Sequence, residues 1–194
     1  GVISAVGQGV TAFAPGDEVV AIAFDSLASH AVTDARLVVK KPAFMSFEQA
    51  AGLPIAYLTA YYAFHYQGHL QAGERVLIRA ATGGVGLAAI QLAKRLGADI
   101  YATAGSPEKR AYLANLGVQH IMDSRSLAFA DEILRETGGE GVDMVLNSLA
   151  GAAITRGLEI LKPYGRFMEI GKRDIYANNK IGLVAFQKNL SFFA

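Results

Sequence analysis

The sequence predicts an α/β fold in which a doubly wound, parallel sheet of six strands follows a smaller β-rich segment. From residue 74 onward, short apolar runs of strand length alternate with longer stretches of helical periodicity, an order typical of parallel sheets. The apolar runs lack polar–apolar alternation, as strands do when helices cover both faces of their sheet. A glycine-rich turn joins the first of these runs to the first helix.

The expected strands and helices have well-marked limits. The runs with strand character are residues 75–80, 99–104, 118–123, 142–148, 165–171 and a last one that begins at Asn189. The stretches with helical periodicity are residues 84–97, 106–117, 127–139 and 152–161. The helix over 106–117 has clear end signals, because Ser106 can cap it, Pro107 fits its first turn and Gly117 follows its end.

The first part of the chain differs in character from the rest. Residues 1–42 contain strand and turn signals, and we assign them to a β-rich lobe separate from a domain over 43–194. Ser46 predicts the start of a helical stretch that is interrupted at Gly52 to Pro54. Residues 1–6 have the pattern of the middle of a strand, and the chain stops inside an apolar run. We therefore interpret it as a piece of a larger polypeptide.

Composition excludes several classes of protein. The formal net charge is +1 and the basic residues are scattered, which argues against a nucleic-acid surface. The chain has no cysteine, so it can form neither a disulfide nor a thiolate zinc site. Its apolar stretches are broken well before the length of a membrane span. We expect a cytoplasmic location, no nucleic-acid partner and no membrane span.

The glycine-rich turn predicts a phosphate-binding site. Ala81, Gly83 and Gly86 occupy the three glycine positions of the G-x-G-x-x-G pattern, between a strand and a helix, where a Rossmann sheet binds a dinucleotide. Alanine in the first position requires the turn to keep ordinary backbone angles. The expected nucleotide contacts are Thr82, Gly83, Gly84, Val85 and Gly86. The alternative is a tight turn with a purely structural role.

The end of the second strand favours NADP(H) over NAD(H). NAD-specific sites place an acid there to bind the ribose 2′-hydroxyl, but the segment from Ala102 to Gly105 contains none. Ser106, Lys109 and Arg110 follow at once and could bind a 2′-phosphate. The alternative for the two basic residues is an ordinary solvated helix face.

Several segments together resemble a known family. They are VGQGVTAFAPGDEVVAIA, GLPIAYLTAYYA, RAATGGVGLAAIQLAKRLGA, DSRSLAF, GGEGVDMVLNSLAG and GRFMEIGKRDIYANNKIG. In this order they resemble the enoyl reductase domains of modular polyketide synthases and animal-type fatty acid synthases, in the medium-chain dehydrogenase/reductase superfamily. The resemblance covers the whole chain and is nearest to mycobacterial, lipid-forming synthases. The first two segments and the glycine turn are shared with quinone reductases, whereas DSR, NSLAG and EIGKRDI are more specific.

The resemblance implies an activity and partners. It implies NADPH-dependent reduction of the α,β-double bond of an enoyl thioester, held on the phosphopantetheine of an acyl carrier protein during polyketide or fatty acid synthesis. It also implies that residues 1–42 are the remnant of a truncated, GroES-like substrate lobe and that other synthase domains are partners. The apolar edge NLSFFA predicts a homodimer that pairs through the last strand.

The resemblance also assigns roles to single residues. Lys172 matches the proposed proton donor, whose acidic partner in the family falls beyond Ala194; the alternative is a surface lysine in a turn. The residues matched to the 2′-phosphate are Ser106, Lys109, Ser124 and Arg125. Thr59 and Asn147 match positions near the nicotinamide or its ribose, although Thr59 could serve packing and Asn147 could bind backbone groups. The chain departs from the family pattern at Arg79, where histidine is common, and at Ala152, where an acid often stands.

The sequence contains one pair of histidines with metal-ligand spacing, and its fold is compatible with two other functions. His65 and His69 have the spacing of zinc ligands on a helix, but no glutamate follows His65 and Gly68 weakens the helix, so we expect no metal site. An NADPH:quinone oxidoreductase would use the same fold with a different acceptor. A catalytically inactive nucleotide-binding module is the third reading. The glycine turn and Lys172 argue against it but do not exclude it.

Overall fold

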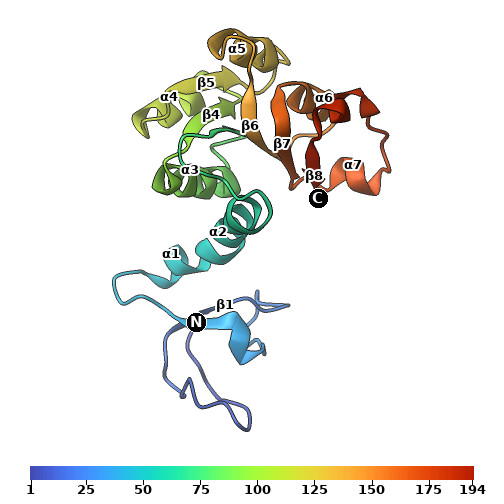
Figure 1. Ribbon diagram of the computed structural model, residues 1–194. Coiled ribbons are helices and arrows are strands. Elements are labelled where there is room, and N and C mark those ends of the chain that lie inside the picture. The colour runs from blue at the N-terminus through green and yellow to red at the C-terminus, as the bar shows by residue number, and fades with distance from the viewer. The chain divides into compact units, whose positions relative to one another are not determined.

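The computed structural model describes residues 1–194 and divides into two compact units, Gly1–Leu58 and Thr59–Ala194 (Figure 1). The strands are β1 Val19–Ala21, β2 Val38–Lys40, β3 Arg75–Ile78, β4 Asp99–Ala104, β5 His120–Asp123, β6 Val142–Asn147, β7 Leu161–Glu169 and β8 Ser191–Phe193. The α-helices are α1 Phe47–Ala51, α2 Leu53–Tyr61, α3 Gly84–Leu96, α4 Pro107–Asn115, α5 Phe129–Glu136, α6 Ala152–Glu159 and α7 Arg173–Tyr176. None of them is long and apolar enough to cross a membrane.

The first unit contains a small antiparallel sheet and a capped helix. Strands β1 and β2 pair with Val19 opposite Lys40. Helix α1 begins with a capping box, in which Ser46 and Gln49 each bind the backbone N–H of the other. The helix start predicted at Ser46 is therefore confirmed. The predicted domain boundary after residue 42 falls inside this unit, and the assignment of 1–42 to a substrate lobe stays a prediction.

The strand predicted over residues 1–6 is wrong. This segment forms only an isolated antiparallel bridge between Val2 and Glu18. The Ile3 N–H donates to the Asp17 carbonyl at 2.9 Å, and the Gly16 N–H donates back to Ile3 at 2.8 Å. Pairing then ends because the opposite segment turns away at Gly16, whose φ of +96° lies outside the strand region.

The second unit contains the six-stranded parallel sheet, in the order β5-β4-β3-β6-β7-β8. The chain builds outward from β3 in one direction and then returns to build outward from it in the other. This is the doubly wound order, so the predicted fold class is confirmed. In such sheets ligands bind in the crevice at the carboxyl ends of the two strands where the direction changes, which here are β3 and β6.

Helices cover both faces of this sheet (Figure 1). One face carries a core cluster in which Leu77, Val145 and Phe167 from the strands pack against Phe129 of α5 and Leu158 of α6. Helices α3 and α4 contact β3, β4 and β5, and their buried side chains lie outside that cluster. Helix α4 starts at a Ser106 cap and is followed by left-handed Gly117, as predicted.

The helical pattern predicted to run on after Pro54 changes type near its end. Residues Tyr62–Gln67 form a π-helical turn, closed by a hydrogen bond of 2.8 Å from the Gly68 N–H to the Ala63 carbonyl. A Cβ atom at Gly68 would collide with the Met144 side chain and lie 2.7 Å from the Ala63 oxygen. The wide turn thus lets the backbone pass close to β6, a long-range contact that periodicity does not reveal.

Candidate functional site

The glycine turn lies between the end of β3 and the start of α3. Gly83 precedes α3 with an extended backbone and no side-chain cap, so the first N–H groups of the helix remain free to bind an anion. A Cβ atom at Gly86 would lie 2.6 Å from the backbone of Ala81. Only glycine allows this close contact between helix and turn, as the pattern predicts for its third glycine.

The tight bend is made one residue earlier than the motif suggests. Ala80 has a left-handed φ of +49°, whereas buried Ala81 donates its N–H to the Thr103 carbonyl at 2.9 Å. Ala81 therefore has the ordinary backbone angles expected of it, whereas Ala80 in the same turn does not. A left-handed alanine costs about 1 kcal/mol. The hydrogen bond of 2.9 Å from the Gly83 N–H to the Ala80 carbonyl offsets part of this cost.

The structure brings the predicted 2′-phosphate residues together at the carboxyl ends of β4 and β5. Ser106 caps α4 by accepting the Lys109 N–H at 3.3 Å. A Cβ atom at Gly105 would lie 3.3 Å from both the Ser124 Oγ and the Arg125 Nε. The loop after β4 thus touches the loop after β5. The Lys109 and Arg125 side chains are exposed.

Two carboxylates also lie in this region, and one of the predicted donors is already engaged. The Arg110 Nη1 donates to the Ala104 carbonyl at 3.1 Å and lies 3.5 Å from the Asp123 carboxylate. Glu108 has a lowered pKa, chiefly because the Ser106 hydroxyl donates to it, with smaller contributions from the charges of Arg110 and Arg125. Lys109 and Arg125 are therefore the cations best placed for an incoming anion.

Two buried polar residues end the neighbouring strands β6 and β7. Asn147 is fully buried, and its Nδ2 donates to the Leu149 carbonyl at 2.7 Å and to the Glu169 Oε2 at 2.6 Å. The Glu169 Oε1 accepts the Gly171 N–H at 2.6 Å. Burial raises the pKa of Glu169, against the opposing effect of these two hydrogen bonds. The sequence predicts Asn147 as a site residue but not Glu169, whose only signal is an acid at the end of an apolar strand.

Lys172 lies just past β7, at the sheet edge where the sequence places it. It immediately precedes the short helix α7, and its carbonyl accepts the Tyr176 N–H at 2.9 Å. The side chain is exposed. The predicted proton donor is therefore within three residues of Glu169 and on the loop that Glu169 holds.

Arg79, which departs from the family pattern, directly follows β3 and lies in an unusual environment. It is only 3% exposed, and none of its three guanidinium nitrogens has a hydrogen-bond partner in the protein. The guanidinium carbon lies 3.7 Å from the centre of the Phe129 ring, a favourable cation–π geometry. Burial lowers the pKa of Arg79 to about 10, so the group still carries its charge at neutral pH.

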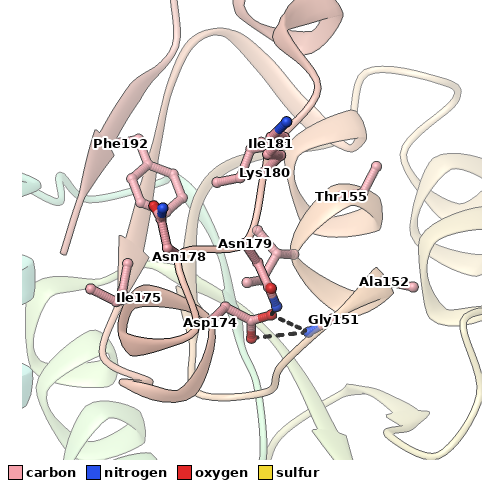
Figure 2. Close-up of a pocket in the computed structure, with 11 residues that line it drawn as sticks. Gly151, Ala152, Thr155, Asp174, Ile175, Asn178, Asn179, Lys180, Ile181 and Phe192 are labelled. Carbon is pink, nitrogen blue, oxygen red and sulfur yellow. Dashed lines mark hydrogen bonds between the residues drawn. The ribbon is translucent and has the colours of Figure 1, made fainter.

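A pocket of about 560 Å³ adjoins the loops that follow β6 and β7. It is lined by residues of α6, α7, the segment after α7 and β8 (Figure 2). At its edge the Asp174 carboxylate accepts the Gly151 N–H at 3.1 Å and the Asn179 Nδ2 at 2.7 Å. Ala152 lines the pocket, but the predicted nucleotide and proton-donor residues do not.

The remaining candidates lie near the start of the second unit. Thr59 is half-buried within α2. His65 lies in the π-helical turn and stacks on Tyr61 with ring centres 4.9 Å apart, whereas His69 has a left-handed backbone. No group of three or more His, Cys, Asp or Glu side chains is placed to hold a metal ion.

The strand order and the glycine turn at the start of α3 define a doubly wound domain of the Rossmann class. A family model described as zinc-binding dehydrogenase matches residues 84–193. The chain is 49% identical to the phthioceranic/hydroxyphthioceranic acid synthase of Mycobacterium tuberculosis, over the whole chain but only 9% of that protein's length.

Two solved structures narrow the family further. The nucleotide-binding subdomain of the enoyl reductase domain of PpsC from M. tuberculosis is 59% identical, with a TM-score of 0.68 over 71% of this chain and 77% of the other. The CurK enoyl reductase is 47% identical, with a TM-score of 0.85 over 100% of this chain and 57% of the other. The chain belongs to the zinc-binding dehydrogenase family of the medium-chain superfamily, in the branch of polyketide synthase enoyl reductases. The resemblance read from its sequence is confirmed.

Proposed function

We propose that the chain takes part in the NADPH-dependent reduction of the α,β-double bond of an enoyl thioester during polyketide or fatty acid synthesis. The observation that carries this proposal is the meeting of the loops after β4 and β5, with exposed Lys109 and Arg125 and no carboxylate at the end of β4. Such a cluster favours a 2′-phosphate over a free 2′-hydroxyl. Membership in a dehydrogenase family supports a pyridine nucleotide as the cofactor.

The turn and the cluster fit different parts of NADPH. The free N–H groups at the start of α3 suit a pyrophosphate, and the residues proposed to contact it are Thr82, Gly83, Gly84, Val85 and Gly86. The residues proposed to hold the 2′-phosphate are Ser106, Lys109, Ser124 and Arg125. Thr59 and Asn147 are proposed to lie near the nicotinamide or its ribose. When bound, NADPH supplies the hydride that reduces the β-carbon.

Lys172 supplies the proton in this proposal. Addition of hydride at the β-carbon leaves an enolate, and the Lys172 ammonium donates one proton from Nζ to the α-carbon. The neutral amine then takes a proton from water, so the group is restored after each turnover. An exposed lysine just past a strand end suits this role, because ligands of doubly wound sheets bind at that edge.

The proposed substrate is carried on the phosphopantetheine of an acyl carrier protein, with other domains of a cytoplasmic synthase as further partners. A homodimer through β8 is also proposed. This strand is the outermost of the sheet, beside β7, so its other edge is open to pairing with a second copy. Sedimentation at increasing protein concentration tests the dimer, and a monomer at all concentrations would contradict it.

The activity is tested in the natural full-length polypeptide by following oxidation of NADPH and of NADH. One acceptor is a crotonyl-pantetheine thioester and the other a simple quinone. We expect thioester turnover with NADPH, and a raised KM for NADPH in Lys109→Ala. Turnover of the quinone alone would identify a quinone oxidoreductase. Tight binding of NADPH with no turnover of either acceptor would identify an inactive nucleotide-binding module.

A further inference from the structure

The polar residues buried in the sheet form a single row. Asn147 and Glu169 end β6 and β7, Arg79 follows β3, and Thr103 is the next-to-last residue of β4. Each of the four is at most 6% exposed. Asn147 lies opposite Glu169 in the strand register. Arg79 continues the β3–β6 register by one residue, since its N–H donates to the Leu146 carbonyl at 2.9 Å. Paired residues of parallel strands point to the same face of a sheet, so the row lies on one face.

The face that carries this row is otherwise apolar. Two residues earlier on the same strands stand Leu77, Val145 and Phe167, all fully buried in the core cluster. Burying polar groups at such a place is costly unless they are hydrogen-bonded. The change from apolar to polar occurs at the carboxyl ends of the strands, where the crevice lies. Packing alone therefore does not explain the row.

Within the row, Glu169 and Asn147 link two loops. The Asn147 Nδ2 binds the Leu149 carbonyl in the loop after β6, and it also binds the Glu169 carboxylate. The other carboxylate oxygen binds the Gly171 N–H in the loop after β7. These contacts of 2.6 to 2.7 Å form a continuous chain between the two loops.

Gly171 shows how closely the carboxylate and the second loop fit. A Cβ atom at this position would lie 2.7 Å from the Glu169 Oε1 and 3.4 Å from the Ser148 carbonyl. A side chain larger than hydrogen would force the carboxylate and this loop apart, whichever of the two moves. The next residue is Lys172, so the hydrogen bond to Gly171 fixes the backbone from which the proposed proton donor extends.

We propose that Glu169 is a positioning residue, which holds Lys172 in place for proton transfer through its hydrogen bond to Gly171 and is itself oriented by Asn147. This inference rests on the proposed role of Lys172. Glu169 accepts two N–H donors, one on each carboxylate oxygen. Glutamine in its place offers one acceptor oxygen, so the Glu169→Gln variant loses either the contact with Gly171 or the contact with Asn147.

The test compares variants of the full-length polypeptide with NADPH and a crotonyl-pantetheine thioester. In Glu169→Gln we expect kcat to fall roughly 10- to 100-fold, because small displacements of a reacting group have effects of this size. The KM for NADPH should stay within about twofold. The D2O isotope effect on kcat should rise and that of deuterated NADPH should fall, because protonation becomes the slow step. A purely structural defect would not exchange the two isotope effects.

Two further variants make the test decisive. Gly171→Ala keeps Glu169 and disrupts the same hydrogen bond at its donor residue. It should reproduce the kinetic change. Thr137→Val removes a buried hydroxyl that binds the Ile133 carbonyl at 2.7 Å and the Gly141 N–H at 2.9 Å, before β6 begins. It should lower stability without changing kcat.

The outcomes separate this inference from the proposed function. If the wild type reduces the thioester, Lys172→Ala does not, and both Glu169→Gln and Gly171→Ala keep the wild-type kcat and isotope effects, the positioning role is overturned alone. If Lys172→Ala keeps full activity, the proton-donor assignment and this inference both fail. If the wild type does not reduce the thioester with NADPH, the proposed function itself fails.

Discussion

The carboxyl edge of the six-stranded sheet contains two regions of opposite character. At β4 and β5 the polar groups are carried by the loops after the strands and by the first turn of α4, and Lys109 and Arg125 are exposed to solvent. At β3, β6 and β7 they stand at the strand end or directly after it, and Arg79, Asn147 and Glu169 are buried. An exposed cation is free to bind a charged ligand, whereas the hydrogen bonds of buried Asn147 and Glu169 hold the loops after β6 and β7. We therefore expect the first region to set cofactor affinity and the second to set the rate.

The largest expected effect is a loss of kcat on removal of the Lys172 side chain, which extends from the loop that the buried row supports. Lys172→Ala should lower kcat by about 10²- to 10⁴-fold, the contribution of a general acid, while the KM for NADPH changes little. Steady-state kinetics with the thioester measure both. Lys180→Ala, which removes another exposed lysine, is the control and should keep the wild-type kcat. Equal rates for Lys172→Ala and the control would show that this loop supplies no proton.

The next largest expected effect is on the KM for NADPH, and it distinguishes the exposed region at β4 and β5 from the buried row. Lys109→Ala and Arg125→Ala should each raise the KM for NADPH about 10- to 100-fold, the value of a hydrogen bond to a charged group. The constants for NADH should stay the same, because it lacks the 2′-phosphate. Arg95→Ala removes an exposed cation in the last turn of α3 and serves as the control. A similar loss with both cofactors would place the 2′-phosphate elsewhere.

The glycine turn allows a test of packing at the edge of both regions. Gly86→Ala should lower the free energy of unfolding by about 1 to 3 kcal/mol, the cost of overpacking, since its Cβ would lie 2.6 Å from the Ala81 backbone. Urea titration measures this. In Gly182→Ala the new Cβ would meet no atom within 4 Å, and its stability should be unchanged. If the two variants unfold alike, α3 does not pack as closely as described.

A smaller expected effect, on the free energy of unfolding, tests how much the buried charge of Arg79 destabilises the fold. Arg79→Met should raise the free energy of unfolding by about 1 to 2 kcal/mol, because it removes a buried charge without a hydrogen-bond partner at the loss of one cation–π contact. Thermal and urea unfolding measure the change. Arg135→Met, at an exposed position of α5, should be nearly neutral. Destabilisation by Arg79→Met would mean that the guanidinium contributes more than its contact with Phe129.

The smallest effect is a dependence of stability on pH. Burial raises the pKa of Glu169 in the folded protein, so the folded state binds this proton more tightly than the unfolded state does. The stabilisation is complete below the unfolded pKa of about 4.3 and is lost as the pH rises through the raised value. Urea titrations over this range should show the stability of wild type falling relative to Glu169→Gln. A constant difference between the two would contradict the raised pKa.

The sequence predicts the position of the exposed polar groups at β4 and β5 better than that of the buried row at β3, β6 and β7, and the reason is physical. Ser106, Ser124 and Arg125 lie directly after apolar strands and Lys109 in the first turn of the helix that Ser106 caps, and the carboxyl ends of neighbouring parallel strands meet. The local signals for α4 were equally direct, with a serine cap and a glycine after its end. The residue types after each strand, with the rule that neighbouring parallel strands end at the same edge of the sheet, are enough to predict that these residues lie close together.

The buried row required information that the sequence does not display. Arg79 and Asn147 occupy neighbouring positions only because β3 and β6 pair in one register, and Glu169 takes the next position through β7. A shift of one residue would turn each side chain to the other face. The strand predicted over residues 1–6 was wrong for a related reason, since its extent depends on where the opposite segment turns at Gly16.

The separate roles of the two regions are tested most directly by a kinetic cycle of Lys109→Ala, Glu169→Gln and the double variant, with NADPH and a crotonyl-pantetheine thioester. We expect Lys109→Ala to change only the KM for NADPH and Glu169→Gln to change only kcat. In the double variant the two effects should add to within about 0.5 kcal/mol, as expected for sites that do not share partners. A fall of kcat in Lys109→Ala, or coupling well above that limit, would show that the two regions do not act separately.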